Sequence, residues 1–372
     1  MRRRAGQEAT DFPLEYCPNG WARLERLREL YEKRTPDKIY ARMDLDTEAL
    51  REFGRRHPEG PTDCPDLEER AAFWDALFRE RRAVEDDSVP AAYLSELDQG
   101  LYGGMIGGAV RFMAHPENGF ISSMVPPILK DWDELTRLTI DHAHPWSQFY
   151  QRELETFRRQ AEGKFGVSHF ILIDSLNFVF ELFGATRTYL ELLDHPECVR
   201  QAVEFAYQLN VDVQKRFFEA VPLLAGGTCS NMMEWVPGRV VSESVDPFHM
   251  TSVDYFEKWG RGPAERMLNA FDGGVLHIHG NGRHLLAAVS TLRGLKAILL
   301  GDDKDFPAAF SMLEAIKVHT GTVPLAVGVG FRDFHKALAA HRLPGGVLYR
   351  VRNVPDQNTA NRTMELVRAY RM

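Results

Sequence analysis

The chain has 372 residues, of which 44% are hydrophobic and 26% are charged, and its formal net charge is −8. This composition is ordinary for a globular protein and excludes the disordered and fibrous classes. The negative charge gives no electrostatic footprint for nucleic acid. The most hydrophobic stretch, residues 169–184, is interrupted by Asp174, Asn177 and Glu181 and cannot span a bilayer. We therefore expect a cytoplasmic protein that binds neither nucleic acid nor membrane.

The chain opens with a helical extension and a short strand. Residues 18–34 carry apolar side chains at helical spacing and predict a helix that ends before Pro36. Residues 38–46, KIYARMDLD, alternate and predict a strand. The glycine-rich stretch 86–108 is too irregular for one simple element. We expect it to be a long segment near the functional site, because long loops in compact domains are usually functional.

Helical and strand patterns alternate regularly beyond residue 128. Helical patterns cover residues 129–163, 185–220, 252–272, 283–293, 305–318, 331–341 and 357–370. Short apolar runs between them predict strands at 167–174, 222–228, 240–244, 274–280, 295–301, 323–330 and 346–351. Such alternation indicates parallel βαβ units, and about eight units fit a closed barrel. The predicted fold class is α/β, a (β/α)8 TIM barrel with an N-terminal helical extension, forming one domain over 1–372 with its core at about 30–372.

The sharpest local feature is the segment GGVLHIHGNGRH, residues 273–284. Side chains two apart in a strand point to the same face, so His277 and His279 should project into one space. The glycines around Asn281 end the strand there, at the carboxyl-terminal end where barrel enzymes keep their sites. Two imidazoles supply two of the three protein ligands of a catalytic zinc site. The alternative is a pair of hydrogen-bonded polar residues without metal.

Two aspartates follow the next strand, in the segment LLGDDKDF. Asp302 or Asp303 should face the same mouth, where a carboxylate is suited to act as a base, hold a substrate cation or bind a metal. The alternative is that Asp303 or Asp305 caps the following helix. We expect one aspartate in each role, and we count Asp302, Asp303 and His279 as the catalytic candidates.

Three more residues are candidate ligands for the metal. Cys229 follows the predicted strand at 222–228 and could offer a thiolate, and Glu234 a carboxylate, although a buried inert cysteine is the common outcome. The segment VVSESVDPFHM places Glu243, Asp246 and His249 after another strand. We take Glu243 as a further candidate ligand. His249 and Asn281 are taken as substrate-binding candidates.

A basic residue near the start of the chain completes the candidate site. Arg42 and Asp44 lie two apart in the first predicted strand and should share a face. An arginine at a barrel mouth suits a substrate carboxylate or phosphate, because its guanidinium binds such groups bidentately. It could equally form a salt bridge with Asp44. No serine-hydrolase elbow, P-loop, H-E-x-x-H or dinucleotide fingerprint occurs.

At these residues the sequence resembles the uroporphyrinogen decarboxylase superfamily, which includes the decarboxylase of haem biosynthesis and the zinc-dependent cobamide and coenzyme M methyltransferases. RTPDKIYARMDLD resembles the opening of the family, and VLHIHGNGRHLL resembles the strand that reads His-x-Cys-Gly-Asn in the methyltransferases. The central segment FILIDSLNFVFELFGATRTYLELLDHPE and the C-terminal segment GGVLYRVRNVPDQNTANRTMELV complete the likeness.

This chain departs from the family at two metal positions. The second zinc ligand of the methyltransferases, a cysteine, corresponds to His279, which keeps the capacity to bind zinc. Their later cysteine ligand falls near Arg352, which is always protonated and cannot bind a metal. Arg352 therefore becomes a candidate for binding a substrate anion. The arginine-rich N-terminal motif of the decarboxylase is reduced here to Arg42.

The resemblance implies three alternative functions. The first is methyl transfer, with zinc held by His277, His279 and a third ligand from Cys229, Glu234 or Glu243, and with a corrinoid carried by a separate protein. The second is metal-free decarboxylation of a carboxylated tetrapyrrole or a smaller acid. The third is a non-catalytic sensor of a small ligand.

Overall fold

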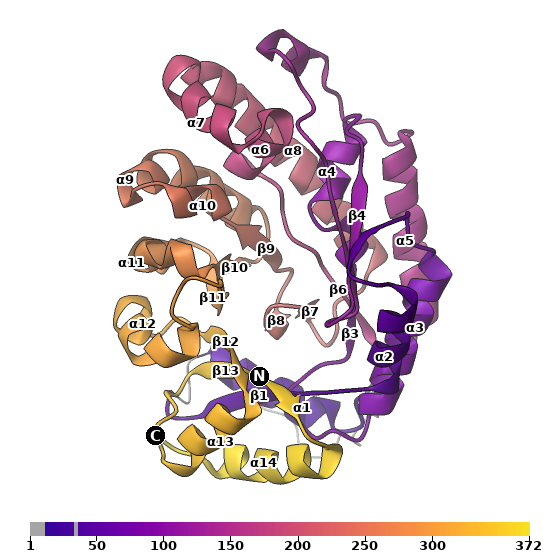
Figure 1. Ribbon diagram of the computed structural model, residues 1–372, viewed down its shortest axis with the longest axis vertical. Coiled ribbons are helices and arrows are strands. Elements are labelled where there is room, and N and C mark those ends of the chain that lie inside the picture. The colour runs from indigo at the N-terminus through magenta and orange to yellow at the C-terminus, as the bar shows by residue number, and fades with distance from the viewer. Residues whose placement is uncertain (1–11, 33–35) are drawn as a thin grey trace, which may run out of the picture.

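The computed structural model describes residues 12–32 and 36–372. Its centre is a six-stranded sheet in the order β1-β13-β12-β11-β10-β9, in which every neighbouring pair is parallel (Figure 1). These strands are β1 (Ile39–Leu45), β9 (Val241–Ser244), β10 (Gly274–Ile278), β11 (Leu295–Leu300), β12 (Leu325–Gly330) and β13 (Val347–Val354).

The parallel arrangement continues beyond β9 only in fragments. A bridge joins Ile171 to Ser242 of β9 in parallel, and β6 (Gly166–Ser168) pairs in parallel with β3 (Ala91–Tyr93). The strand pairs of the described residues do not join into one ring, so the predicted closed barrel is not seen. The structure shows a TIM-barrel-like α/β fold. The remaining pairs are antiparallel: β2 (Gly60–Thr62), β4 (Arg111–His115) and β5 (Phe120–Met124) in one sheet, and β7 (Gly227–Ser230) with β8 (Glu234–Pro237).

Helices surround the outside of the strands in Figure 1. They are α1 (Gly20–Tyr31), α2 (Glu48–Arg56), α3 (Leu67–Arg81), α4 (Gly100–Met105), α5 (Pro145–Ala161), α6 (Ser175–Phe183), α7 (Ala185–Asp194), α8 (Pro196–Ala220), α9 (Val253–Tyr255), α10 (Arg261–Ala270), α11 (Leu286–Val289), α12 (Leu313–Thr320), α13 (Phe331–Ala339) and α14 (Gln357–Ala369). The helix α1 confirms the predicted extension. None of the described helices is long and apolar enough to cross a membrane.

Several predicted elements differ from the structure in their bounds, and two of them do so for local reasons. The helical pattern at 129–163 gives the 3-10 helix η2 (Trp132–Arg137) and then α5, which begins where His144 caps the first turn and Pro145 occupies the first helical position. The irregular stretch 86–108 is more ordered than expected. It contains β3, the short 3-10 helix η1 (Ser95–Leu97) and α4, and all six residues of α4 are buried.

Strand register defines which side chains point to the inner face of the sheet, away from the helices. Tyr349 of β13 packs against the rings of Phe310 and Phe334, so its face of the sheet is the helix-covered one. Tyr349 lies in register with Val327, Val327 with Leu300, and Leu300 with Ile278. Because successive side chains alternate, the neighbours of these residues point to the opposite, inner face. That face carries His277 of β10 and Arg350 and Arg352 of β13.

A buried ion pair fixes the position of η1 against α3. Arg70 of α3 and Glu96 of η1 are each about 1% exposed, and the guanidinium donates to the Glu96 carboxylate and, at 2.7 Å, to the Gly119 carbonyl. The same guanidinium lies over the rings of Phe53 and Phe73. Since Asp98 follows η1 directly, this pair helps to hold Asp98 in position.

We predict that Arg70→Met lowers the free energy of unfolding by about 3 kcal/mol, because it leaves the Glu96 carboxylate buried without a partner. Chemical denaturation monitored by circular dichroism measures the loss. Arg159→Met is the matched control, since Arg159 pairs with Glu68 at the surface, where both side chains are more than half exposed. Equal losses for the two variants would contradict the prediction.

Candidate metal and anion site

Two histidines and one aspartate converge at the carboxyl-terminal ends of β9 and β10. His277 lies in β10 and His279 follows its last residue, while Asp246 begins the 3-10 helix η3 (Asp246–Met250) after β9. One ligand atom from each of the three lies within 4.8 Å of the other two. The rings of His277 and His279 are 5.1 Å apart. The predicted shared face of the two histidines is therefore confirmed, and the carboxylate beside them is Asp246.

The Asp246 carboxylate governs the charge of this cluster. Its Oδ1 lies 3.0 Å from Nε2 of His277 and 3.5 Å from Nδ1 of His249. Burial alone would raise the pKa of Asp246, but His277 and the other two imidazoles lower it overall. Burial disfavours protonated His277, yet the Asp246 charge outweighs burial and raises the pKa of His277. Asp246 is therefore ionised and attracts a cation, whether a proton or a metal ion.

Asp303 orients the ring of His279 by contacting its Nδ1 atom. Its Oδ1 lies 3.0 Å from Nδ1 of His279, and its Oδ2 accepts from the backbone N–H of Asn281 at 3.2 Å. With Nδ1 engaged, His279 has Nε2 left for a ligand. A carboxylate on the outer nitrogen of a histidine is the usual second partner of a metal-binding imidazole. Asp302 instead accepts from the N–H of Ala309 at 2.7 Å and so caps the next 3-10 helix. Asp303 thus contacts His279, and Asp302 rather than Asp303 or Asp305 contacts the start of the next 3-10 helix, while a functional role for either stays a prediction.

His249 forms the buried wall of the cluster. It is 6% exposed, its ring is 5.7 Å from that of His279, and its Nε2 has no hydrogen-bond partner. Burial lowers the pKa of His249 to about 4, so the ring is neutral at neutral pH. A Cβ on Gly282 would come within 2.2 Å of this ring. The second glycine of the Gly-Asn-Gly turn therefore makes room for His249, and Asn281 between the glycines places its side-chain nitrogen 3.8 Å from the sulfur of Met250.

Asp98 is a residue of the site that no motif in the sequence indicated. Burial raises the pKa of Asp98 to about 6. Its carboxyl shares a hydrogen bond with Tyr93 and interacts electrostatically with His277 and Asp246. Its Oδ1 has no partner among the described residues. The only feature of the sequence that pointed to Asp98 was its place in the irregular stretch 86–108, which we expected near the functional site.

Arg42 is placed on the inner face but is neutralised there. It lies opposite Arg350 in the β1–β13 register. Its guanidinium donates to Asp44 at 2.7 Å and to Glu234 at 3.1 Å. Burial would raise the pKa of Asp44, but Arg42, Arg81 and Arg350 together lower it. Glu234, expected as a zinc ligand, serves instead as a buried counter-charge for Arg42 and accepts from the N–H of Val89.

Glu243 points away from the histidines. His277 lies in register with Ser244, so Glu243, one residue earlier, shares the helix-covered face with Leu276. Burial, and next the nearby Asp174 carboxyl, raise the pKa of Glu243 well above its ordinary value. Glu243 is therefore not brought to the metal cluster, contrary to the expectation from the sequence.

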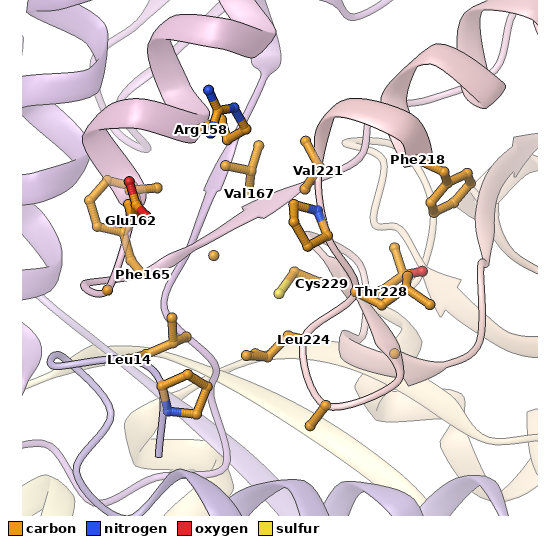
Figure 2. Close-up of a pocket in the computed structure, with 18 of the residues that line it drawn as sticks. Leu14, Arg158, Glu162, Phe165, Val167, Phe218, Val221, Leu224, Thr228 and Cys229 are labelled. Carbon is orange, nitrogen blue, oxygen red and sulfur yellow. The ribbon is translucent and has the colours of Figure 1, made fainter. Parts of the chain in front are cut away.

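Cys229 is also removed from the cluster. It packs with Leu14, Cys17 and Trp235 in a separate apolar group. It lines a cavity of about 360 Å³ with largely apolar walls at the amino-terminal end of β6 (Figure 2). Burial raises the pKa of its thiol to about 12. Among the described residues, the third candidate metal ligand beside His277 and His279 is therefore Asp246, not Cys229, Glu234 or Glu243.

A comparison with solved structures supports the fold described above, whereas comparisons of the sequence find no match. No family model and no curated protein matches the sequence. Among solved structures, a methyltransferase from Methanosarcina mazei superposes with a TM-score of 0.59 over 92% of this chain and 97% of that one, at 13% sequence identity. The chain thus has a methyltransferase-like α/β fold. A likeness at this identity establishes the fold alone, and no particular family is assigned.

We predict that Cys229 and Cys17 resist alkylation in the folded protein, whereas the exposed Cys64 is labelled first. Burial raises the pKa of Cys17 to about 11, so both buried thiols remain protonated and shielded near neutral pH. Iodoacetamide labelling followed by peptide mass spectrometry measures the order, and unfolded protein serves as the control. Labelling of Cys229 as fast as Cys64 in the folded protein would show that the thiol is accessible.

Proposed function

We propose that this protein is a metal-dependent enzyme that transfers a methyl group to or from a small substrate at the carboxyl-terminal mouth of its barrel. The observation that carries the proposal is the convergence of Asp246, His277 and His279 within 4.8 Å. Two imidazoles and a carboxylate are a ligand set of catalytic zinc sites, which keep a further position open for substrate. The methyltransferase-like fold supports the choice of reaction.

The orphaned atoms of the cluster fit a bound cation. Nδ1 of His277 and Nε2 of His249 are buried without a hydrogen-bond partner. Buried polar atoms are rarely left in this state, so each one calls for a ligand, an ion or a water molecule. Asp246, His277 and His279 would hold the metal, and Asp303 would fix the orientation of His279. When bound, the metal supplies Lewis acidity to a thiol, amine or ether group of the substrate.

The transfer breaks the bond between the substrate heteroatom and its methyl carbon and forms a new bond from that carbon to the acceptor. The heteroatom keeps the electron pair of the broken bond and takes up a proton from water, while the acceptor, in its reduced nucleophilic form, supplies the electron pair of the new bond. We expect the acceptor to be a corrinoid on a separate protein. His249 and Asp98 border the same space and would restrict water and position the substrate.

A second candidate is decarboxylation of a carboxylated tetrapyrrole or smaller acid without a metal. The observation that favours it is the row of arginines on the inner face, Arg42, Arg350 and Arg352. Binding of such an acid with neither methyl transfer nor decarboxylation would instead favour a sensor.

The metal is tested with matched variants. We predict near-stoichiometric zinc in protein purified without chelators, and its loss in Asp246→Asn and His279→Ala. Asp303→Asn should weaken zinc about 10- to 100-fold, because it removes the outer partner of His279. Competition with a chromophoric chelator measures the affinities.

Asp302→Asn is the control for Asp303→Asn, since Asp302 is adjacent in the chain but caps a helix. Cobalt loading tests the open position: a small thiol added to cobalt-loaded protein should produce a sulfur-to-cobalt charge-transfer band. Wild-type protein without zinc, or with equal zinc affinity in the Asp302 and Asp303 variants, would overturn the proposed centre.

A further inference from the structure

Two arginines on the inner face make no direct ion pair, within the described part of the chain, of the kind that their neighbour Arg42 makes. Arg42 is paired with Asp44 and Glu234, but neither Arg350 nor Arg352 has a hydrogen bond or ion pair among the described residues. Burial, and next the charge of Arg42, lower the pKa of Arg350, which shows that the local acids do not fully offset these cations. The guanidinium of Arg350 is partly buried and is destabilising there without an anion, whereas Arg352 is exposed to solvent and open to a dissolved anion.

The strand next to these arginines carries glycines where it faces them. Gly328 of β12 lies in register with Arg350, and Gly330 with Arg352. Neither glycine has a positive φ, and a Cβ on Gly330 would meet no atom within 4 Å. On Gly328 it would only reach ordinary contact with the Arg352 guanidinium, at 3.6 Å. Backbone conformation and packing therefore do not require glycine, and its effect is to leave space beside both cations.

A bulge aims Arg352 into this space. The β1–β13 register shifts between Met43 and Leu45, where β13 carries an extra residue, and Asn353 has a φ of 60°. Bulges of this kind redirect side chains and are common next to active sites. The result places the guanidinium of Arg352 over Gly328, on the face that also carries His277.

The two halves of the mouth lie within the reach of one small molecule. His277 and Arg350 share the inner face, and β10 and β13 are three strand spacings apart, roughly 14 Å along the sheet. Curvature of the sheet shortens the direct path. A substrate that reacts beside the histidines can therefore extend its other end to the arginines.

We propose that Arg350 and Arg352 form an anion subsite, and that the substrate carries a carboxylate or phosphate group at the end remote from the methyl group. The substrate part of this inference rests on the proposed function, whereas the subsite rests on the geometry of β12 and β13. Arginine suits both anions, because its planar fork donates two parallel hydrogen bonds to a carboxylate or a phosphate.

The test uses the full chain as purified, with inorganic phosphate and malonate as separate probes at fixed ionic strength. Isothermal titration should show binding of at least one probe by the wild type, weakened at least tenfold in the double variant Arg350→Gln/Arg352→Gln. Gly328→Val should weaken binding without a change of charge, since its side chain fills the space beside Arg352. Arg111→Gln, on the outlying strand β4, is the control and should bind as the wild type does.

The outcomes separate the two anions and the two proposals. Tighter phosphate identifies a phosphate-bearing substrate, and tighter malonate a carboxylate-bearing one; either supports the subsite. No probe binding by the wild type, or unchanged binding in the double variant with its thermal unfolding midpoint preserved, overturns the subsite. Zinc content is measured on the same samples. Zinc without anion binding overturns this inference alone, and anion binding without zinc overturns the proposed function alone.

Discussion

The partly buried Asp246 carboxylate is the charge around which the candidate site at the strand ends is arranged. It lies 3.0 Å from His277 and 3.5 Å from His249, and the charges of all three imidazoles lower its pKa. A carboxylate in such a place must be compensated, because an isolated buried charge costs several kcal/mol. The Asp246 charge raises the pKa of His277 and so favours a proton on that ring, and a metal ion shared with His277 and His279 would compensate the carboxylate equally well.

Around this centre, the metal-ligand candidates and the basic side chains lie on different strands. The histidines and Asp246 end β9 and β10, while the arginines lie on β1 and β13. Between these two groups, the inner face of β12 is bare at Gly328 and Gly330. Glu234 neutralises Arg42 from the β7–β8 hairpin and so prevents the basic side from becoming more strongly charged. In our proposal, the site offers a cation position and an anion position on one face, which suits a substrate with two chemically different ends.

Local sequence rules predicted the parts of the site that depend on a single strand. The i, i+2 spacing of His277 and His279 required a common face, and that of Arg42 and Asp44 permitted the salt bridge that the structure contains. The same rules failed for Cys229 and Glu243. Whether a residue faces the mouth depends on strand register and on neighbouring packing, and neither is encoded in the spacing of one segment.

The sequence by itself determined the α/β class, the N-terminal helix, the alternation of strands and helices, and the pair of histidines at a strand end. These follow from periodicity and from turn residues, which act over a few positions. Only the tertiary structure decided that Asp246 is the third member of the cluster, that Asp303 orients His279, and that Arg350 joins Arg352. Each of these contacts joins different strands or the loops that follow them, so its distance is set by sheet register and burial rather than by proximity in the chain.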